Sequence, residues 1–209
     1  MVLSVVPGKR TAENTKTLVG AVKNRIADIP SLIVSDEYPP YKEAILETFG
    51  QKVIPNRTGK RGRPKAAYNV PCPGLKYATV HKTREKGRVI KIDLRVIFGT
   101  EAEVKNALSL SQVSKSINTA FIERQNGTDR NRNARKTRKT YCFSKDWHIH
   151  DSVTYFTMYS YNFCWPVRTL RCRDVMGNWQ PRTPAMVAGL ANHVWTLSEW
   201  LTFPSVQLK

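Results

Sequence analysis

The segment that decides the fold reads SLIVSDEYPPYKEAILETF and covers residues 31–49. Its first four residues form an apolar run of the kind that makes a buried parallel strand. A Ser-Asp-Glu tripeptide and two prolines then separate this run from a helical pattern over residues 41–49. Asp36 therefore lies at the carboxyl end of the strand, where open α/β sheets collect their ligand-binding groups. A carboxylate just after a strand is also a common helix N-cap, so both roles stay open for Asp36.

The residues before this segment add a second strand and a second helix. Residues 1–6 (MVLSVV) are apolar, and the Pro-Gly pair that follows ends them, which indicates a short strand. Residues 11–27 carry apolar side chains at helical spacing, namely Leu18, Val19, Val22 and Ile26. The order strand, helix, strand, helix predicts an α/β fold.

Residues 51–99 differ sharply in composition from the residues before them. Lysine and arginine dominate this segment, and its acidic residues are Glu85 and Asp93. Its first half is rich in glycine and proline, which predicts an extended chain. Apolar residues alternate on both sides of residues 85–87, which predicts a basic β-hairpin. We therefore expect residues 51–99 to be a basic insertion in the main fold.

Residues 60–65 of this insertion read KRGRPK. The Arg-Gly-Arg-Pro core resembles the AT-hook, a short segment that lies extended in the minor groove of A·T-rich DNA. Glycine allows the backbone to approach the groove floor, and proline keeps the chain extended. The arginines enter the narrow groove, where the negative potential is greatest. A solvated basic linker has the same composition, so that interpretation also stays open.

After residue 99 the pattern becomes helical again. Thr100 heads one helix, and residues 116–140 form a strongly cationic second helix with Glu123 near its apolar end. An aromatic-rich helix follows over residues 150–163. The chain then closes with a helix that contains Leu190, Val194, Trp195, Leu197 and Trp200. We expect a partial core over residues 1–50, the insertion over 51–99, the Glu-bearing and closing helices of the main domain over 100–171, and a terminal helical module over 172–209.

The net charge is the most informative property of the composition. Lysine and arginine total 34 against 16 aspartate and glutamate, which gives +18 and an isoelectric point near 10.0. A field of this size favours a polyanionic partner. No apolar run approaches the ~18 residues of a membrane-spanning helix, and the N-terminus has no signal-peptide pattern. Nucleic acid is therefore favoured over an anionic membrane, with a basic RNA-binding or ribosomal protein as an alternative.

The four cysteines give a weak metal signal. Cys72, Cys142, Cys164 and Cys172 form no CxxC pair, and His148 with His150 adds only an HxH pair. We expect reduced thiols in a cytoplasmic protein.

Three further motifs follow one another in a specific order. They are SDEYPPYKEAI at residues 35–45, NTAFIERQNGTDRNRNARKTRKT at residues 118–140, and YNFCWPVRTLR at residues 161–171. Together they resemble the catalytic domain of prokaryotic insertion-sequence transposases of the DDE class. The resemblance implies an α/β fold, here a truncated RNase H-like (integrase-like) mixed sheet with flanking helices and an inserted basic β-hairpin. It also implies DNA transposition by metal-dependent cleavage and transfer of DNA strands.

The resemblance implies Asp36 as the second catalytic aspartate and Glu123 as the catalytic glutamate. In this class three carboxylates hold two divalent cations, Mg²⁺ or Mn²⁺, which are hard ions that prefer oxygen ligands. Between the two residues lie 86 others, an interval that the basic insertion lengthens. Glu37 stands where the family commonly has glycine and adds negative charge beside the metal site.

The first aspartate of the class has no clear counterpart. Only Glu13 and Asp28 are acidic before Asp36, and neither lies on an apolar strand. We therefore expect the opening strands and the N-terminal DNA-binding module to be missing. Since two carboxylates leave two metal ions incompletely coordinated, we expect little or no strand transfer by this chain alone.

Two main hypotheses follow from the differences between this sequence and the family pattern. The first is an incomplete transposase whose first aspartate comes from a second polypeptide, and which is a homo-oligomer when it acts at the nucleoid. The second is a non-catalytic DNA-binding remnant of a transposase. Both bind double-stranded DNA, as transposon ends or target. The residues expected to contact DNA are Lys60, Arg61, Arg63, Lys65, Arg84, Lys86, Arg88, Arg124, Arg130, Arg132, Arg135, Lys136, Arg138 and Lys139.

Overall fold

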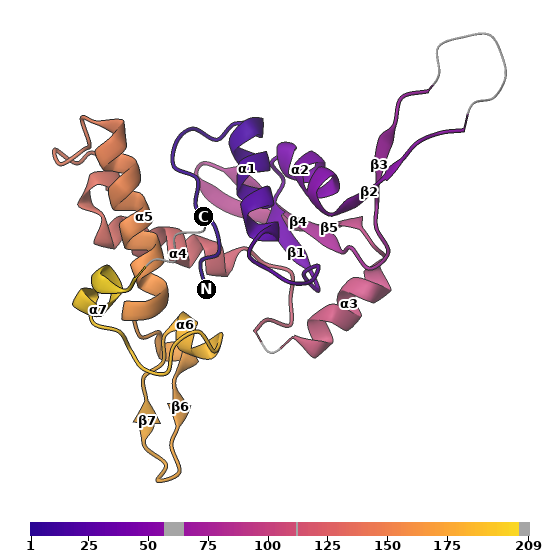
Figure 1. The fold of residues 1–209 in the computed structure, drawn as a ribbon. Coiled ribbons are helices and arrows are strands. Elements are labelled where there is room, and N and C mark those ends of the chain that lie inside the picture. The colour runs from indigo at the N-terminus through magenta and orange to yellow at the C-terminus, as the bar shows by residue number, and fades with distance from the viewer. Residues whose placement is uncertain (57–64, 112, 205–209) are drawn as a thin grey trace. The chain divides into compact units, whose positions relative to one another are not determined.

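The computed structural model describes residues 1–56, 65–111 and 113–204 (Figure 1). The chain divides into two compact units. One is Gly8–Arg124, called the sheet unit below. The other, called the helical unit, joins Met1–Pro7 with Gln125–Lys209. Each unit is described by itself.

The sheet unit is built on a three-stranded mixed sheet. Its strands are β1 (Ile33–Asp36), β4 (Tyr77–Glu85) and β5 (Arg88–Phe98), in the order β1-β4-β5. Strand β1 runs parallel to β4, and β4 runs antiparallel to β5. The parallel register pairs Asp36 with Val80. The expected strand of residues 31–34 is thus confirmed, displaced by two residues so that Asp36 ends it.

The basic β-hairpin expected after residue 75 is also confirmed, but its place in the fold differs from the expectation. Lys86 and Gly87 turn the chain with φ of 48° and 80°, which suits the tight turn between two twisted strands. The first half of β4 is buried and pairs with β1. The hairpin is therefore integral to the main sheet and not an addition to it. The reason is that the first four residues of β4, Tyr-Ala-Thr-Val, are uncharged and suit a buried central strand.

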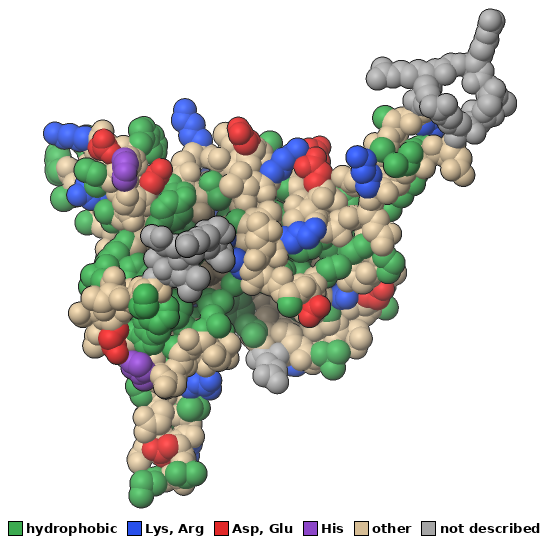
Figure 2. Space-filling model, viewed as in Figure 1, with side chains coloured by type: hydrophobic (Ala, Val, Ile, Leu, Met, Phe, Trp, Pro, Cys, Tyr) green, Lys and Arg blue, Asp and Glu red, His purple; other side chains and the backbone are tan. Residues whose placement is uncertain are grey.

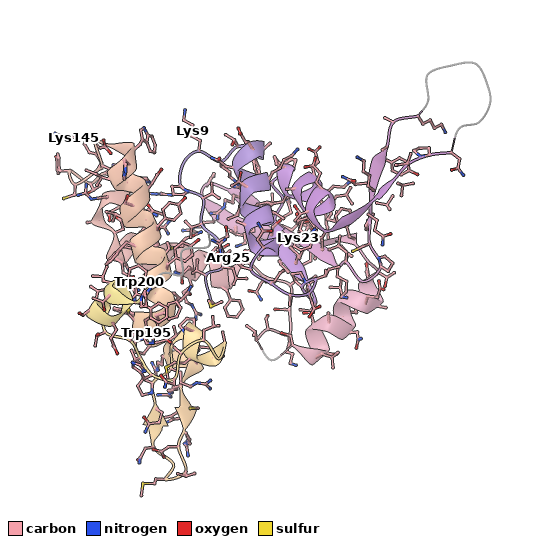
Figure 3. All side chains as sticks on the ribbon, viewed as in Figure 1. Lys9, Lys23, Arg25, Lys145, Trp195 and Trp200 are labelled. Atoms are coloured by element: carbon pink, nitrogen blue, oxygen red, sulfur yellow. The ribbon has the colours of Figure 1, made fainter. Side chains whose placement is uncertain are left out.

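Two helices complete the core of the sheet unit. Helix α1 (Ala12–Lys23) begins at its N-cap Thr11, and α2 (Pro40–Phe49) packs against α1. Both helices were expected from the sequence, although α1 ends at Lys23, four residues before the expected end at residue 27. Lys23 at the end of α1 donates to the carbonyl of Thr48 on α2 (Figure 3). The core cluster contains Val19, Ala44, Ile45, Phe49, Leu75, Tyr77 and Phe98.

The remaining elements of the sheet unit are a ribbon and a helix. Strands β2 (Gly50–Val53) and β3 (Tyr68–Pro71) pair antiparallel as a separate two-stranded sheet. Lys60, Arg61 and Arg63 lie outside the described residues, so most of the AT-hook-like hexapeptide does too. Helix α3 (Glu101–Leu110) begins with the expected Thr100, whose side chain forms a capping box with Glu103.

The N-terminal residues do not form the strand expected for residues 1–6. They are non-regular and belong to the helical unit. The side chain of Asn162 accepts from the backbone N–H of Val2 and donates to its carbonyl, both at 2.8 Å. One amide side chain thus satisfies the backbone groups that a neighbouring strand would otherwise have paired.

The helices of the helical unit differ in length from the expectation, since the one expected over residues 116–140 is shorter and the one expected over residues 150–163 is longer. Helix α4 (Ala120–Arg132) crosses from the sheet unit into the helical unit, and α5 (Trp147–Cys164) is its longest helix. The helix expected over residues 116–140 is therefore shorter at both ends. At its C-terminal end, Asn133 caps a separate 3-10 turn, Ala134–Lys136. The other elements are a second 3-10 turn at Arg168–Leu170, β6 (Cys172–Arg173), β7 (Trp179–Gln180), α6 (Pro184–Val187) and α7 (Leu197–Thr202).

The helix expected at the C-terminal end is in fact two short helices. Residues between α6 and α7 leave the helical conformation, since Thr183 and Thr196 each start a new capped turn. The aromatic residues of this segment pack on α5 (Figure 3). The ring of Trp195 lies 4.8 Å from that of Phe163, and the ring of Trp200 lies 5.3 Å from that of Phe156. These tryptophans therefore hold the segment against α5.

In the part of the chain that the structure describes, no helix is both long and apolar enough to span a lipid bilayer.

Gly50, where α2 passes directly into β2, provides a test of this fold. A Cβ atom on Gly50 would lie 2.3 Å from the carbonyl oxygen of Leu46 and 2.7 Å from that of Val70. We expect Gly50→Ala to lower the free energy of unfolding by roughly 1–3 kcal/mol, because backbone atoms must move. A urea titration followed by circular dichroism measures the change.

Gly20 provides the matched control for Gly50. It lies inside α1, and no atom comes within 4 Å of the Cβ position. We expect Gly20→Ala to raise the free energy of unfolding by roughly 0.5–1 kcal/mol, because alanine loses less chain entropy in a helix. Equal effects of the two substitutions would contradict the close packing between α2, β2 and β3.

Candidate functional site

A pocket of about 390 Å³ lies at the carboxyl end of β1 in the sheet unit. Strand β1 and the residues after it supply one wall, the middle of β4 supplies another, and the start of α4 supplies a third. Asp36 and Glu123 both line it, although 86 residues separate them in the sequence. The lining residues are Arg10, Asp36, Glu37, Tyr38, Pro39, Val80, His81, Lys82, Arg84, Thr119 and Glu123.

Asp36 does not cap the helix that follows it. The N-cap position of α2 is Pro39, which makes no side-chain cap hydrogen bond. The two carboxylate oxygens of Asp36 instead accept from Nη2 of Arg10, at 2.6 and 2.7 Å. This hydrogen bond raises the pKa of the Arg10 guanidinium. The N-cap alternative for Asp36 is therefore wrong, and the carboxylate is a pocket group.

Arg10 is itself held in place by an aromatic side chain. Its guanidinium carbon lies 4.1 Å from the centre of the Tyr38 ring, a cation–π distance. The hydroxyl of Tyr38 donates to the backbone carbonyl of Arg10 at 2.9 Å. The Arg10–Asp36 pair is nevertheless about half exposed, so its contribution to stability is roughly 0–1 kcal/mol.

Glu123, the other carboxylate implied by the resemblance, is also held by side chains of the sheet unit. Its Oε1 accepts from Nζ of Lys82 at 2.5 Å and from the hydroxyl of Thr119 at 2.8 Å. Thr119 is buried and lies one turn before Glu123 at the start of α4. The hydrogen bond from Lys82, followed by the one from Thr119, lowers the pKa of Glu123. The carboxylate is therefore ionised at neutral pH and paired with a cation of β4.

Glu37 is the third carboxylate at this pocket. Arg95 of β5 donates to one of its oxygens, and Nδ1 of His81 on β4 contacts the other. The negative charge that Glu37 adds is thus compensated by Arg95, and His81 makes a second contact with the carboxylate. Because side chains on a strand alternate between faces, His81 reaches Glu37 while Lys82, one residue later, reaches Glu123.

The described residues of the pocket do not by themselves form a metal centre. Within residues 1–56, 65–111 and 113–204, no group of three or more His, Cys, Asp or Glu side chains could hold a metal ion. Asp36, Glu37 and Glu123 are each paired with a basic side chain of the same unit. The two carboxylates implied by the family resemblance share the pocket with Glu37, but among the described residues these side chains do not form a group that could hold a metal ion.

The basic residues expected to bind DNA fall into two groups in the sheet unit. Arg84 lines the pocket, and Lys86 and Arg88 form and follow the turn between β4 and β5. Lys65 is exposed at the end of the loop before β3. Figure 2 shows basic and acidic side chains interspersed over the visible face of this unit. The basic side chains near the pocket are thus arranged along β4 and its turn.

The basic residues of α4 and the turn after it are used in two different ways. Arg132 stacks on Trp165 at 3.3 Å and lies 5.2 Å from the centre of the Tyr161 ring, and burial lowers its pKa. Lys136 donates to Asp129 at 2.7 Å in a largely buried pair. Both stabilise the helical unit internally, which composition did not indicate. Arg124, Arg130, Arg135, Arg138 and Lys139 are exposed.

Several pocket residues were not expected from the sequence. Arg10, His81, Lys82 and Thr119 come from three separate segments that only the fold brings together. The one local signal was the spacing of Thr119 and Glu123, four residues apart on consecutive turns. Arg10 had no such signal, because its partner Asp36 is 26 residues away.

The comparisons with known proteins agree with one part of this site. Residues 96–162 match the family model described as IS1 transposase. Neither the curated proteins nor the solved structures contain a significant match. The matched segment includes α3, α4 with Glu123, and nearly all of α5. The match covers less than half of the chain, and this segment is therefore similar to IS1 transposases.

Proposed function

We propose that this chain is the DNA-binding and carboxylate-bearing part of a DDE-class transposase, which acts in cleavage and transfer of DNA strands. The observation that carries the proposal is that Asp36 and Glu123 line one pocket across 86 intervening residues. A second support is that the match to IS1 transposases covers Glu123. Carboxylates that meet in this way, surrounded by basic side chains, suit chemistry at a DNA phosphate.

The basic side chains of β4 are the proposed phosphate contacts. Lys82 and Arg84 are two residues apart on the strand and both line the pocket, and Lys86 follows in the turn. A DNA strand that runs along β4 would meet these three cations in succession. Arg10–Asp36 is an exposed ion pair and Lys82–Glu123 is a partly exposed one, with side-chain exposures of 54%/51% and 26%/56%. A phosphate can therefore compete for their cations, at a cost of about 0–1 kcal/mol for the exposed pair.

Catalysis on this proposal needs a carboxylate from outside the described residues. In sites of this class, the chemistry that Mg²⁺ or Mn²⁺ supplies is activation of the attacking hydroxyl and neutralisation of the leaving oxygen. Within the described sheet, β1 pairs only with β4, so the other edge of β1 takes no strand of this unit. An open edge accepts a further strand readily. We infer that a second polypeptide adds a strand there and brings the first aspartate next to Asp36.

The proposed assembly therefore contains more than one chain. A homo-oligomer that holds two transposon ends and a target would act on nucleoid DNA in the cytoplasm. This chain by itself would bind duplex DNA and would transfer strands poorly or not at all.

A second candidate function is a DNA-binding remnant without catalysis. It is favoured by the ion pairs of the pocket, in which Arg10, Lys82 and Arg95 already neutralise Asp36, Glu123 and Glu37. On this view the carboxylates only position basic side chains for DNA. The upstream reading frame separates the two candidates, since an intact overlapping frame encoding a strand with aspartate favours the split enzyme.

The first prediction concerns the salt dependence of DNA binding. We expect the affinity for a duplex to fall steeply with salt, since each phosphate contact contributes a slope of about −0.9 in log K against log [salt]. The double variant Arg84→Gln/Lys86→Gln should reduce the magnitude of this slope by about 2. Fluorescence anisotropy with a labelled duplex measures it.

The matched control removes the same charge elsewhere in the sheet unit. Lys16 on α1 and Lys105 on α3 are each paired with an acidic residue of the unit and do not line the pocket. The variant Lys16→Gln/Lys105→Gln should leave the slope within a few tenths of the wild-type value. Equal slopes for both double variants would show that β4 does not contact DNA.

The second prediction concerns strand transfer. The purified chain, with pre-cut transposon ends and Mg²⁺ or Mn²⁺, should give little or no joined product. Addition of the polypeptide encoded by the upstream frame should produce joined DNA. Asp36→Asn and Glu123→Gln should each abolish that product, because each removes a proposed metal ligand. Gel electrophoresis of labelled ends measures the joined DNA.

Glu101→Gln is the control for this assay, since Glu101 is exposed on α3 and lies outside the pocket. It should keep the wild-type yield. Robust joining by the purified chain alone, lost in Glu123→Gln, would show that the first carboxylate lies within this chain. Absence of product in every mixture, with DNA binding intact, favours the remnant.

A further inference from the structure

The helical unit carries a projecting β-ribbon that neither the pocket nor the family match explains. Strands β6 and β7 pair antiparallel, with Arg173 opposite Trp179, and the ribbon extends away from α5, α6 and α7 (Figure 1). It lies after residue 162, beyond the segment that matches IS1 transposases. Residues 171–182 are called the β6–β7 arm below.

The tip of the arm is held in one conformation by Asp174. Its Oδ1 accepts from the backbone N–H groups of Met176 and Asn178, both at 2.9 Å, and its Oδ2 accepts from the side chain of Gln180. These hydrogen bonds, the one from Gln180 first, lower the pKa of Asp174. The carboxylate is thus used inside the arm, and the tip is pre-organised before any partner binds.

The arm presents apolar side chains at its end. Val175 and Met176 are the two most exposed hydrophobic residues of the arm, at 106% and 85%. Figure 2 shows hydrophobic side chains at the tip of this ribbon. Burial of these two side chains in an apolar environment is favourable, because it removes apolar surface from water.

The base of the arm is cationic and aromatic. The guanidinium groups of Arg171 and Arg173 lie 3.9 and 4.9 Å from the centre of the Trp179 ring. Residues 165–183 contain four arginines, the others being Arg168 and Arg182, against the single acidic residue Asp174. Since the oxygens of Asp174 accept hydrogen bonds within the arm, its outer surface is strongly positive.

We propose that the β6–β7 arm is a DNA-bending device that inserts Val175 and Met176 between base pairs from the minor groove while Arg171 and Arg173 bind the flanking phosphates. Apolar wedges of this kind unstack a base step and kink the duplex by roughly 20–90°. The positive charge of the arm favours DNA over a protein as the partner. An apolar pocket on a protein would match the tip alone, whereas a groove flanked by phosphates matches both the tip and its arginines.

The inference rests on the proposed function in one respect, namely that the chain binds duplex DNA. It adds that the chain deforms the duplex through residues that do not line the pocket. Pyrimidine–purine steps such as TA unstack most readily, so the arm should prefer them without any base-edge hydrogen bonds.

A fluorescence experiment tests the arm on the full chain. The probe is a duplex with a donor and an acceptor dye at its ends and one central TA step, which also carries 2-aminopurine as a reporter of unstacking. Wild-type protein should increase energy transfer, as a kink of roughly 20–90° requires, and should increase 2-aminopurine fluorescence. Val175→Asn/Met176→Asn should remove both signals, while the affinity falls by less than about tenfold because the phosphate contacts remain.

Leu110→Asn is the matched control, since Leu110 is an apolar side chain of comparable exposure, 74%, at the end of α3. It should leave both signals at the wild-type level. Arg171→Gln/Arg173→Gln should reduce the magnitude of the salt slope by about 2. Circular dichroism shows that each variant is folded.

The outcomes separate this inference from the proposed function. No binding of duplex DNA by the wild-type protein overturns the proposed function. Binding without a kink, equal in wild type and tip variant, overturns the arm and leaves the proposed function intact. Loss of self-association in the tip variant by light scattering, with DNA bending unchanged, assigns the tip to a protein contact and also overturns the arm.

Discussion

The parallel pairing of β1 with β4 is the contact on which the rest of the sheet unit depends. It starts where the N–H of Ile33 donates to the carbonyl of Lys76 at 2.9 Å, and it ends with Asp36 opposite Val80. Tyr77 stabilises this register from the buried side, because its ring packs on Phe98 and its hydroxyl lies 2.7 Å from Ser35 Oγ. A slip by one residue would move every side chain of β1 to the other face. The pocket would then lose its carboxylate and the core would lose its apolar residues.

The same register explains the electrostatics of the pocket. Three acidic side chains meet there, and each is neutralised by a basic side chain from a different part of the fold. The chain as a whole carries +18, so this neutralised site belongs to a strongly cationic molecule. A polyanion is attracted to the molecule generally, while at the pocket three carboxylates line one site. A net charge of this size favours binding of a polyanion.

Aromatic residues have two roles in the helical unit. Trp195 and Trp200 pack edge or tilted against rings of α5 and hold the C-terminal segment in place. Trp165 and Trp179 are instead about half exposed and carry arginine side chains over their rings. The second arrangement fixes a guanidinium without neutralising it. At Trp179 it leaves the positive charge of the exposed Arg171 and Arg173 available, whereas Arg132 over Trp165 is half-buried and stabilises the helical unit internally.

The sequence by itself determined the elements that depend on local patterns. The run before Asp36, the cap at Thr100 and the β-hairpin around Gly87 are all present, because apolar spacing, capping side chains and turn residues act over a few positions. Tertiary structure alone decided the rest. Residues 1–6 were wrongly expected to be a strand, since the groups that satisfy Val2 come from Asn162, 160 residues away. Likewise, the pairing of β4 with β1 and the resulting contacts of Arg10 and Lys82 arise between distant segments. No local pattern encodes such contacts, because their free energy appears only when the sheet has formed.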